Sequence, residues 1–183
     1  MGLMLKTGGG GGATAPEGFE EGNYTLRLDM VSDPLAMQCV WDERDVPYDE
    51  CRKEEQAEWS FRIVGGPFDG TVVRQRITHL REFDNTDEDG VLTRVPRYLW
   101  SEKATFGAFV RAVLGLPEKG NLPPGTDFDT NKVLGRTIRG WVSVNERGYF
   151  KIEKPKATAQ GAPARREPVA VASASQEADE NPF

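Results

Sequence analysis

The clearest pattern in the chain is an alternation of apolar and polar residues near its beginning. In residues 23–30 (NYTLRLDM), apolar side chains occupy every second position. Successive side chains of a β-strand point to opposite faces, so the pattern predicts a half-buried strand whose inward row is Tyr24, Leu26, Leu28 and Met30. The alternation returns in 59–63 (WSFRI) and 71–78 (TVVRQRIT), on either side of the glycine-rich turn 65–70. These two segments predict a β-hairpin.

The spacing of apolar residues becomes helical between residues 101 and 114. Ser101 is a suitable N-cap residue, and Gly115 followed by Pro117 would end the helix. The apolar positions recur three and four residues apart, at Phe106, Phe109, Val110, Val113 and Leu114.

Two more alternating segments, 136–144 and 149–152, flank a polar turn at 145–148 and predict a second hairpin. The expected order is therefore three strands, one helix and two strands. A five-stranded Greek-key barrel with its helix between strands 3 and 4, the OB-fold, has this order. Another small α+β sheet is the alternative, and we expect a mainly β, OB-fold-like barrel.

Composition divides the chain into three parts. Residues 1–21 contain five consecutive glycines and little hydrophobic pattern, so we expect a flexible glycine-rich arm. From Pro155 onward the chain is rich in Ala, Pro, Ser and Gln, and no aromatic residue occurs before Phe183. Such a segment cannot bury enough apolar surface to offset its ordering entropy. We therefore expect one domain at 22–154 and a disordered tail at 155–183.

Two polar stretches interrupt the predicted domain. Residues 32–56 are interpreted as a long inserted loop, and residues 82–89, with five acids and no base, as an acidic loop. The segment starting at Asn85 resembles the beginning of a calcium loop. Its twelfth position is Pro96, where a bidentate glutamate would be needed, so we expect no metal site.

The net charge of −6 and the pI of about 5.0 argue against a nucleic-acid-binding protein when they are taken alone. The distribution of charge matters more than its sum. Residues 42–58 hold eight acids and three bases, and the last seven residues hold three acids. Outside these stretches and the acidic loop, the chain is mildly basic.

Each predicted strand carries a cation opposite its apolar row, and two strands add an aromatic ring. Cations follow the phosphates of a single strand, and flat rings stack on unpaired bases, worth about 1–3 kcal/mol per base. An ordinary solvated sheet face is the alternative interpretation. We predict a DNA-binding face made of Arg27, Arg62, Arg74, Arg76, Arg139, Trp141, Tyr149 and Lys151.

The end of the chain is a short acidic run closed by an aromatic residue. This tip resembles the C-terminus of bacterial single-stranded-DNA-binding proteins, in which a disordered linker leads to acids followed by Pro-Phe. The resemblance implies that the last ring docks in a pocket on replication, recombination or repair proteins, while the carboxylates meet a basic rim. The residues of this predicted partner-binding tip are Asp179, Glu180, Asn181, Pro182 and Phe183.

The domain is similar to a phage family of small single-stranded-DNA-binding proteins. The similarity lies in Glu21–Tyr24 (EGNY), Phe61–Gly70 (FRIVGGPFDG), Phe109–Gly115 (FVRAVLG) and 134–152. The insertion at 32–56 departs from the family's pattern. The resemblance implies sequence-independent binding of single-stranded DNA, and in a phage the tip would recruit host or phage replication enzymes. A structural or interaction protein of a phage particle, with no role in DNA binding, is the alternative function.

The sequence offers no credible catalytic set. His79 is the only histidine and is expected at the end of a strand, and with this one histidine neither a Ser/His/Asp nor a Cys/His arrangement is credible. A small nuclease would need carboxylates clustered on ordered strands. We therefore expect no enzyme, cofactor or metal.

Localisation is expected to be cytoplasmic, in the host cytoplasm if the protein is phage-encoded. The N-terminus lacks the apolar stretch of a secretory signal, and no apolar run approaches the roughly 20 residues of a membrane span. Cys39 and Cys51 do not have metal-ligand spacing, so they are expected to be free, reduced thiols.

Overall fold

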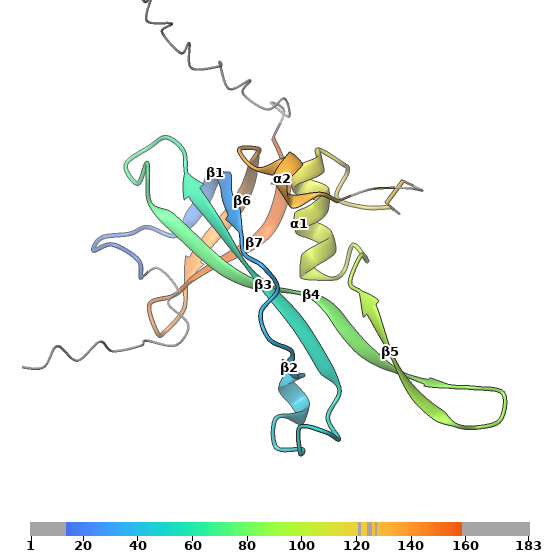
Figure 1. Ribbon diagram of the computed structural model, residues 1–183. Helices are drawn as coiled ribbons and strands as arrows, with labels where there is room; N and C mark the ends of the chain where they lie inside the picture. Colours follow the sequence, from blue (N-terminus) through green and yellow to red (C-terminus); the bar gives the residue numbers. More distant parts are fainter. Residues whose placement is uncertain (1–13, 121, 124–125, 127, 159–183) are drawn as a thin grey trace, which may run out of the picture.

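The computed structural model describes residues 14–120, 122–123, 126 and 128–158. They form a mainly β fold in which one antiparallel sheet curls into a half-barrel (Figure 1). The elements are β1 (Gly22–Val31), β2 (Gln38–Cys39), β3 (Lys53–Ile63), β4 (Val72–Thr86), β5 (Leu92–Tyr98), α1 (Thr105–Leu114), α2 (Thr130–Val133), β6 (Thr137–Val144) and β7 (Phe150–Ala157). The strand order is β5-β4-β3-β1-β6-β7, and β2 pairs with β3.

Strand β1 lies between β3 and β6 and is hydrogen-bonded to both. Leu26 is opposite Ile63 on one side and Ile138 on the other, and all three side chains are buried. Directly opposite residues share a face of the sheet. This face, called the inner face below, carries the core. The alternation predicted for the start of the chain is confirmed.

A β-bulge at Asp29 changes this alternation near the end of β1. Leu28 is opposite Phe61, and Met30 is opposite Ser60, so Asp29 is the extra residue. A bulge reverses which side chains point inward. The expectation that Met30 is buried is therefore wrong: Met30 is exposed, and Val31 packs against the core instead.

Helix α1 covers the inner face. Phe106, Phe109, Val110 and Val113 are buried, as their spacing predicted. The ring of Phe109 lies 5.8 Å from Trp59 and 5.6 Å from Phe61, measured between ring centroids. These aromatic contacts join the helix to the middle of β3.

The ends of α1 follow the prediction in part. The helix ends at Gly115, whose left-handed φ of 74° lets its N–H reach the carbonyls of Ala112 and Arg111. The start is later than expected. Ala104 is the N-cap residue, and the hydroxyl of Ser101 accepts from the N–H of Lys103 at 3.3 Å instead of capping α1.

The inserted loop expected at 32–56 is more ordered than predicted. It contains β2, a short 3-10 helix at Trp41–Glu43 and the first residues of β3, which begins at Lys53. Pairing of β2 with β3 places Cys39 opposite Lys53 and brings the Cα atoms of Cys39 and Cys51 to 5.6 Å. The two cysteines form a disulfide, so the expectation of free thiols is wrong.

The acidic loop expected at 82–89 is also partly strand. β4 continues to Thr86, turns at 87–90, and returns as β5. The two strands extend beyond the rest of the sheet as an arm (Figure 1). His79 accordingly lies within β4 and is buried, and not at a strand end as expected.

The domain extends past both of its expected boundaries. Within the predicted flexible arm, residues 14–21 are described: Phe19 packs on Tyr24, Phe68 and Phe150, with its ring centroid 4.9 Å from that of Phe68. At the other end, β7 runs to Ala157. Residues 1–13 and 159–183 lie outside the described residues.

The half-barrel has a seam between β4 and β7. These strands are not neighbours in the hydrogen-bonded order. The side-chain oxygen Oε1 of Gln75 accepts from the backbone N–H of Ile152 at 2.8 Å. A side chain therefore takes the place of a ladder bond at this position.

A glycine on α1 makes its close packing possible. A Cβ atom at Gly107 would lie 2.2 Å from the carbonyl oxygen of Ser101 and 2.6 Å from that of Trp100. Both contacts are with backbone, which cannot rotate away.

We predict that Gly107→Ala lowers the free energy of unfolding by about 3 kcal/mol, because helix and backbone must separate. Urea unfolding followed by circular dichroism measures the change. Gly22→Ala is the matched control, since its added Cβ would meet only a Tyr24 ring atom at 3.8 Å. Equal stability of the two variants would contradict the predicted close approach.

Candidate nucleic-acid interface

The predicted cations lie on the face of the sheet opposite the core, called the outer face below. Arg27 is opposite Arg62 across β1 and β3. Arg139 is opposite Thr25, and Trp141 is opposite Asn23, across β1 and β6. The alternation that buries one row of each strand turns the other row outward.

The remaining predicted residues extend the same face. Arg74 and Arg76 of β4 are opposite Ser60 and Glu58 of β3, and Lys151 of β7 is opposite Ser143 of β6. Tyr149 precedes β7 and is partly exposed. The curled sheet thus distributes the eight predicted side chains over β1, β3, β4, β6 and the start of β7.

Asp29 lies between two of the arginines. The bulge in β1 turns its carboxylate to accept from Nε of Arg27 at 2.9 Å and from Nε of Arg62 at 2.7 Å. Partial burial alone would raise the pKa of Asp29, but the two hydrogen bonds and the two positive charges outweigh it and lower the pKa. Asp29 therefore offsets part of the charge of this pair.

The cations of the outer face differ in how they are paired. Lys151 bonds Glu153 at 2.5 Å, and Arg74 lies 4.0 Å from Glu58. For the side chains of Arg76 and Arg139 we find no hydrogen bond or ion pair within the described residues. These two guanidiniums are the ones most available to a phosphate.

The sequence analysis missed several residues beside Trp141. Trp141 is 40% exposed and lines a hollow of about 390 Å³ together with Asn23, Glu153, Lys154 and Lys156. Lys156 is opposite Arg139. The sequence analysis ended the last strand at Ile152. It therefore placed Lys154 after the strand and Lys156 in the tail, whereas β7 continues to Ala157. The alternation of charged residues from Lys151 and Glu153 onward could have indicated the longer strand.

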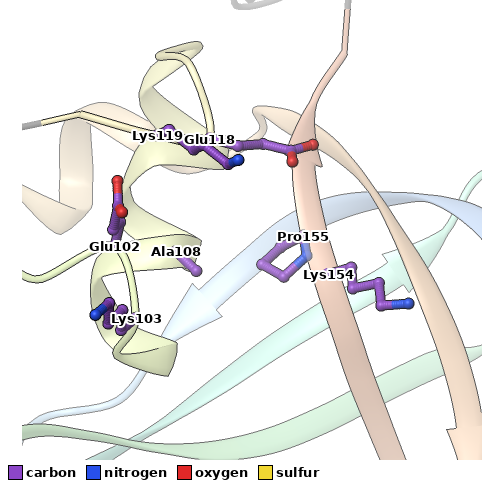
Figure 2. A pocket seen from close by; sticks show the side chains of 7 residues that line it. All are labelled: Glu102, Lys103, Ala108, Glu118, Lys119, Lys154 and Pro155. Atoms are coloured by element: carbon purple, nitrogen blue, oxygen red, sulfur yellow. The ribbon is translucent and has the colours of Figure 1, made fainter.

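A second hollow, of about 250 Å³, lies between α1 and the end of β7 (Figure 2). Lys103, Lys119 and Lys154 line it together with Glu102 and Glu118. Glu118 bonds Lys156 at 2.8 Å, and Glu102 accepts from the N–H of Gly120 at 2.6 Å. Three lysines thus face two acids, and both acids already have partners.

The disulfide-closed loop of the insertion forms an acidic knob beside the β4–β5 arm. Arg94 of β5 donates to the carbonyl oxygen of Cys51 at 2.7 Å and to that of Glu50 at 2.5 Å. Trp41, in the 3-10 helix of this loop, is 69% exposed, and the guanidinium of Arg44 lies 3.6 Å from its ring centroid. The insertion is therefore anchored to the arm and presents an exposed ring among acids.

Comparison of the chain with protein-family models, curated proteins and solved structures found no match. The helices in the described part of the chain are too short or too polar to cross a membrane. Within the same residues, no group of three or more His, Cys, Asp or Glu side chains could hold a metal ion.

The paired Asp29 makes stability depend on pH in a defined window. Its folded-state pKa is lowered, so its contribution is present above the unfolded value of about 3.9 and is lost as the pH falls through the folded value. We predict that Asp29→Asn lowers stability at pH 7 and loses less than the wild type between pH 4 and 2.

Urea unfolding at pH 7, 4, 3 and 2 tests this expectation. Asp45→Asn, at an exposed position in the insertion, is the matched control and should follow the wild type. Parallel pH profiles of wild type and Asp29→Asn would show that the Arg27–Asp29–Arg62 contacts do not hold in solution.

Proposed function

We propose that this chain binds single-stranded DNA without sequence preference and acts in DNA replication, recombination and repair. The observation that carries the proposal is the outer face. There Arg76 and Arg139, whose side chains have no partner in the described part of the chain, lie on the same sheet face as the exposed ring of Trp141. Guanidiniums contact phosphates, and an exposed indole stacks on a base. A duplex keeps its bases stacked inside, so this combination favours single strands.

The arrangement of the strands supports an OB-fold-like barrel as the basis of this function. In the proposal, β1, β3, β4, β6 and β7 are the five barrel strands, and β1 pairs with both the second and the fourth of them. Helix α1 then lies between the third and fourth barrel strands. β2 and β5 would be additions to the barrel. OB-folds bind oligonucleotides on such a sheet face.

Asp29 has a place in this proposal. A carboxylate shared by Arg27 and Arg62 reduces the attraction of the central outer face for phosphates. The exposed cations at its borders, on β4 and on β6–β7, would then contact the DNA backbone most strongly. The strand would cross the sheet from Arg76 toward Trp141.

The acidic tip is proposed to recruit partner proteins. Its final ring supplies an apolar anchor and its carboxylates supply charge for a basic rim on the partner. The tip lies outside the described residues, so this part of the proposal rests on the sequence.

The first test is the fluorescence anisotropy of labelled oligo-dT against a duplex of equal length in a salt series. We expect tight binding of oligo-dT, weak binding of the duplex, and a log–log slope against salt of about −0.7 for each phosphate neutralised. Strand-indifferent or absent binding would leave a structural role in a phage particle as the remaining candidate function.

Variants of the outer face locate the interaction. Trp141→Ala should weaken oligo-dT binding by about tenfold through lost stacking, whereas Trp41→Ala, at the more exposed tryptophan of the acidic knob, should not. Arg76→Ala and Arg139→Ala should each reduce the salt slope by about 0.7. An equal effect of the two tryptophan variants would argue against the outer face.

Deletion of residues 177–183 should tighten oligo-dT binding at low salt, because the acidic tip would compete with DNA for the cationic face. Phe183→Ala keeps all the acids of the tip and is the matched control, so it should bind oligo-dT like the wild type. Anisotropy titrations of the three proteins at low and high salt make the comparison, and an unchanged affinity after deletion would exclude this competition.

A further inference from the structure

A cleft lined by aromatic rings opens at one end of the core, where β1 leaves the sheet. It is formed by the end of β1, by β3, β4 and β5, by α1 and by the segment before α2, and its volume is about 540 Å³. Sites for small ligands occupy about 300–1,000 Å³. The rings of this aromatic cleft are Trp59, His79, Tyr98, Trp100, Phe106 and Phe128.

The rings are arranged as a series of planes. Trp59 and Phe128 stack at 7° with centroids 5.8 Å apart, and His79 and Tyr98 lie at 25° with centroids 6.1 Å apart. Trp100 is 5.7 Å from Tyr98. Tyr98 is 53% exposed, whereas Trp59 is buried. The cleft therefore has a closed aromatic floor and an open aromatic rim.

His79 lines the cleft and has a buried ring nitrogen that lacks a partner among the described residues. His79 is 8% exposed, and its Nε2 lies 2.7 Å from Oε1 of Glu55. The carboxylate makes Nε2 the protonated nitrogen. The other ring nitrogen, Nδ1, is buried and forms no hydrogen bond within the described residues. Buried polar atoms in native proteins are nearly always hydrogen-bonded. Because Nδ1 has almost no accessible surface, a ligand in the cleft would reach it only after the ring turned toward the opening.

The charges around the cleft restrict which kind of ligand it can bind. No lysine or arginine is among the residues that line it, and its polar groups include Ser32, Asp33, Thr130 and Asn131. A phosphate or an acidic peptide, including the chain's own tip, would find no cation there and would meet the Asp33 carboxylate. A flat, uncharged heterocycle with hydrogen-bond donors and acceptors fits both the rings and the polar groups.

The position of the cleft connects it with the outer face. β5 is the edge strand of the sheet, and Tyr98 is its last residue. Arg97, the preceding residue, is opposite Arg81 and exposed, and neighbouring strand residues point to opposite faces. A strand that crosses this edge can place a phosphate on Arg97 and the adjoining base beside Tyr98.

We infer that the aromatic cleft binds one unpaired nucleobase, held beside Tyr98 and Trp100. The inference rests on the proposed binding of single-stranded DNA and adds to it a second contact region, separate from the outer face.

The test compares full-length Tyr98→Ala with the wild type in anisotropy titrations of oligo-dT and of an abasic oligonucleotide of equal length. Tyr98→Ala should weaken oligo-dT binding by about tenfold and leave binding of the abasic strand unchanged. Tyr98→Phe keeps the ring and should restore affinity. Tyr48→Ala, at a tyrosine 57% exposed outside the cleft, is the matched control and should bind like the wild type.

Photo-crosslinking of the wild type to oligo-dT that carries 5-iodouracil gives an independent readout. Cross-links that map to Tyr98 or Trp100 are expected. If the wild type binds oligo-dT but Tyr98→Ala behaves like Tyr48→Ala and no cross-link maps to the cleft, the inference is wrong and the proposed function stands. Equal weakening of dT and abasic strands would also overturn it, because the contact would be with the backbone. No binding of oligo-dT by the wild type would overturn both.

Discussion

The guanidinium of Arg111, buried inside the protein, holds the helix in its place. It donates to the carbonyl oxygens of Trp100 at 3.0 Å, Gly107 at 3.1 Å and Gly120 at 2.6 Å. A buried cation is costly unless its donors are satisfied, and three carbonyls here offset much of that cost. The group thus ties together the segment that enters α1, the helix itself and the segment that leaves it.

Much of the described structure depends on this connection. Because the backbone of Trp100 is held against Gly107, α1 lies close enough to β3 for its phenylalanines to reach Trp59 and Phe61. The same contact fixes Trp100 and Phe106 at the mouth of the aromatic cleft. The helix covers the inner face, and the side chains that do not face it point outward. The position of the helix is therefore linked to the set of cations that lie on the outer face.

The elements with strong patterns were predictable from the sequence. The alternation in 23–30 and 59–63 and the helical spacing up to Leu114 gave their type and, except for Met30, their inward rows. The same alternation identified the outward arginines of the candidate site. It did not show that Asp29 would bridge two of them, because the bulge that turns this carboxylate depends on the pairing of β1 with β3.

Other parts depend on contacts that no local pattern contains. The beginning of β3 (KEEQAEW) is polar, and Glu54 is buried there because Arg81, on the neighbouring strand, bonds it at 2.7 Å. β5 contains Pro96, which lacks a backbone N–H and which a sheet tolerates at an edge strand. The disulfide required the register of β2 on β3, and the aromatic cleft joins residues from Val31 to Asn131.

The seam at Gln75 has a mechanical consequence for the chain that follows the domain. β7 is bonded to β6 through a ladder with one irregularity between Arg139 and Trp141, but on its other side we find, among the described residues, one side-chain bond to β4. Any pull on the chain beyond Ala157 reaches the half-barrel through this strand, one residue pair at a time, beginning at the pair Ile138–Ala157. Tension on the tail would therefore separate β7 from β6 first and loosen both the Trp141 side of the outer face and the packing of α1 on β7.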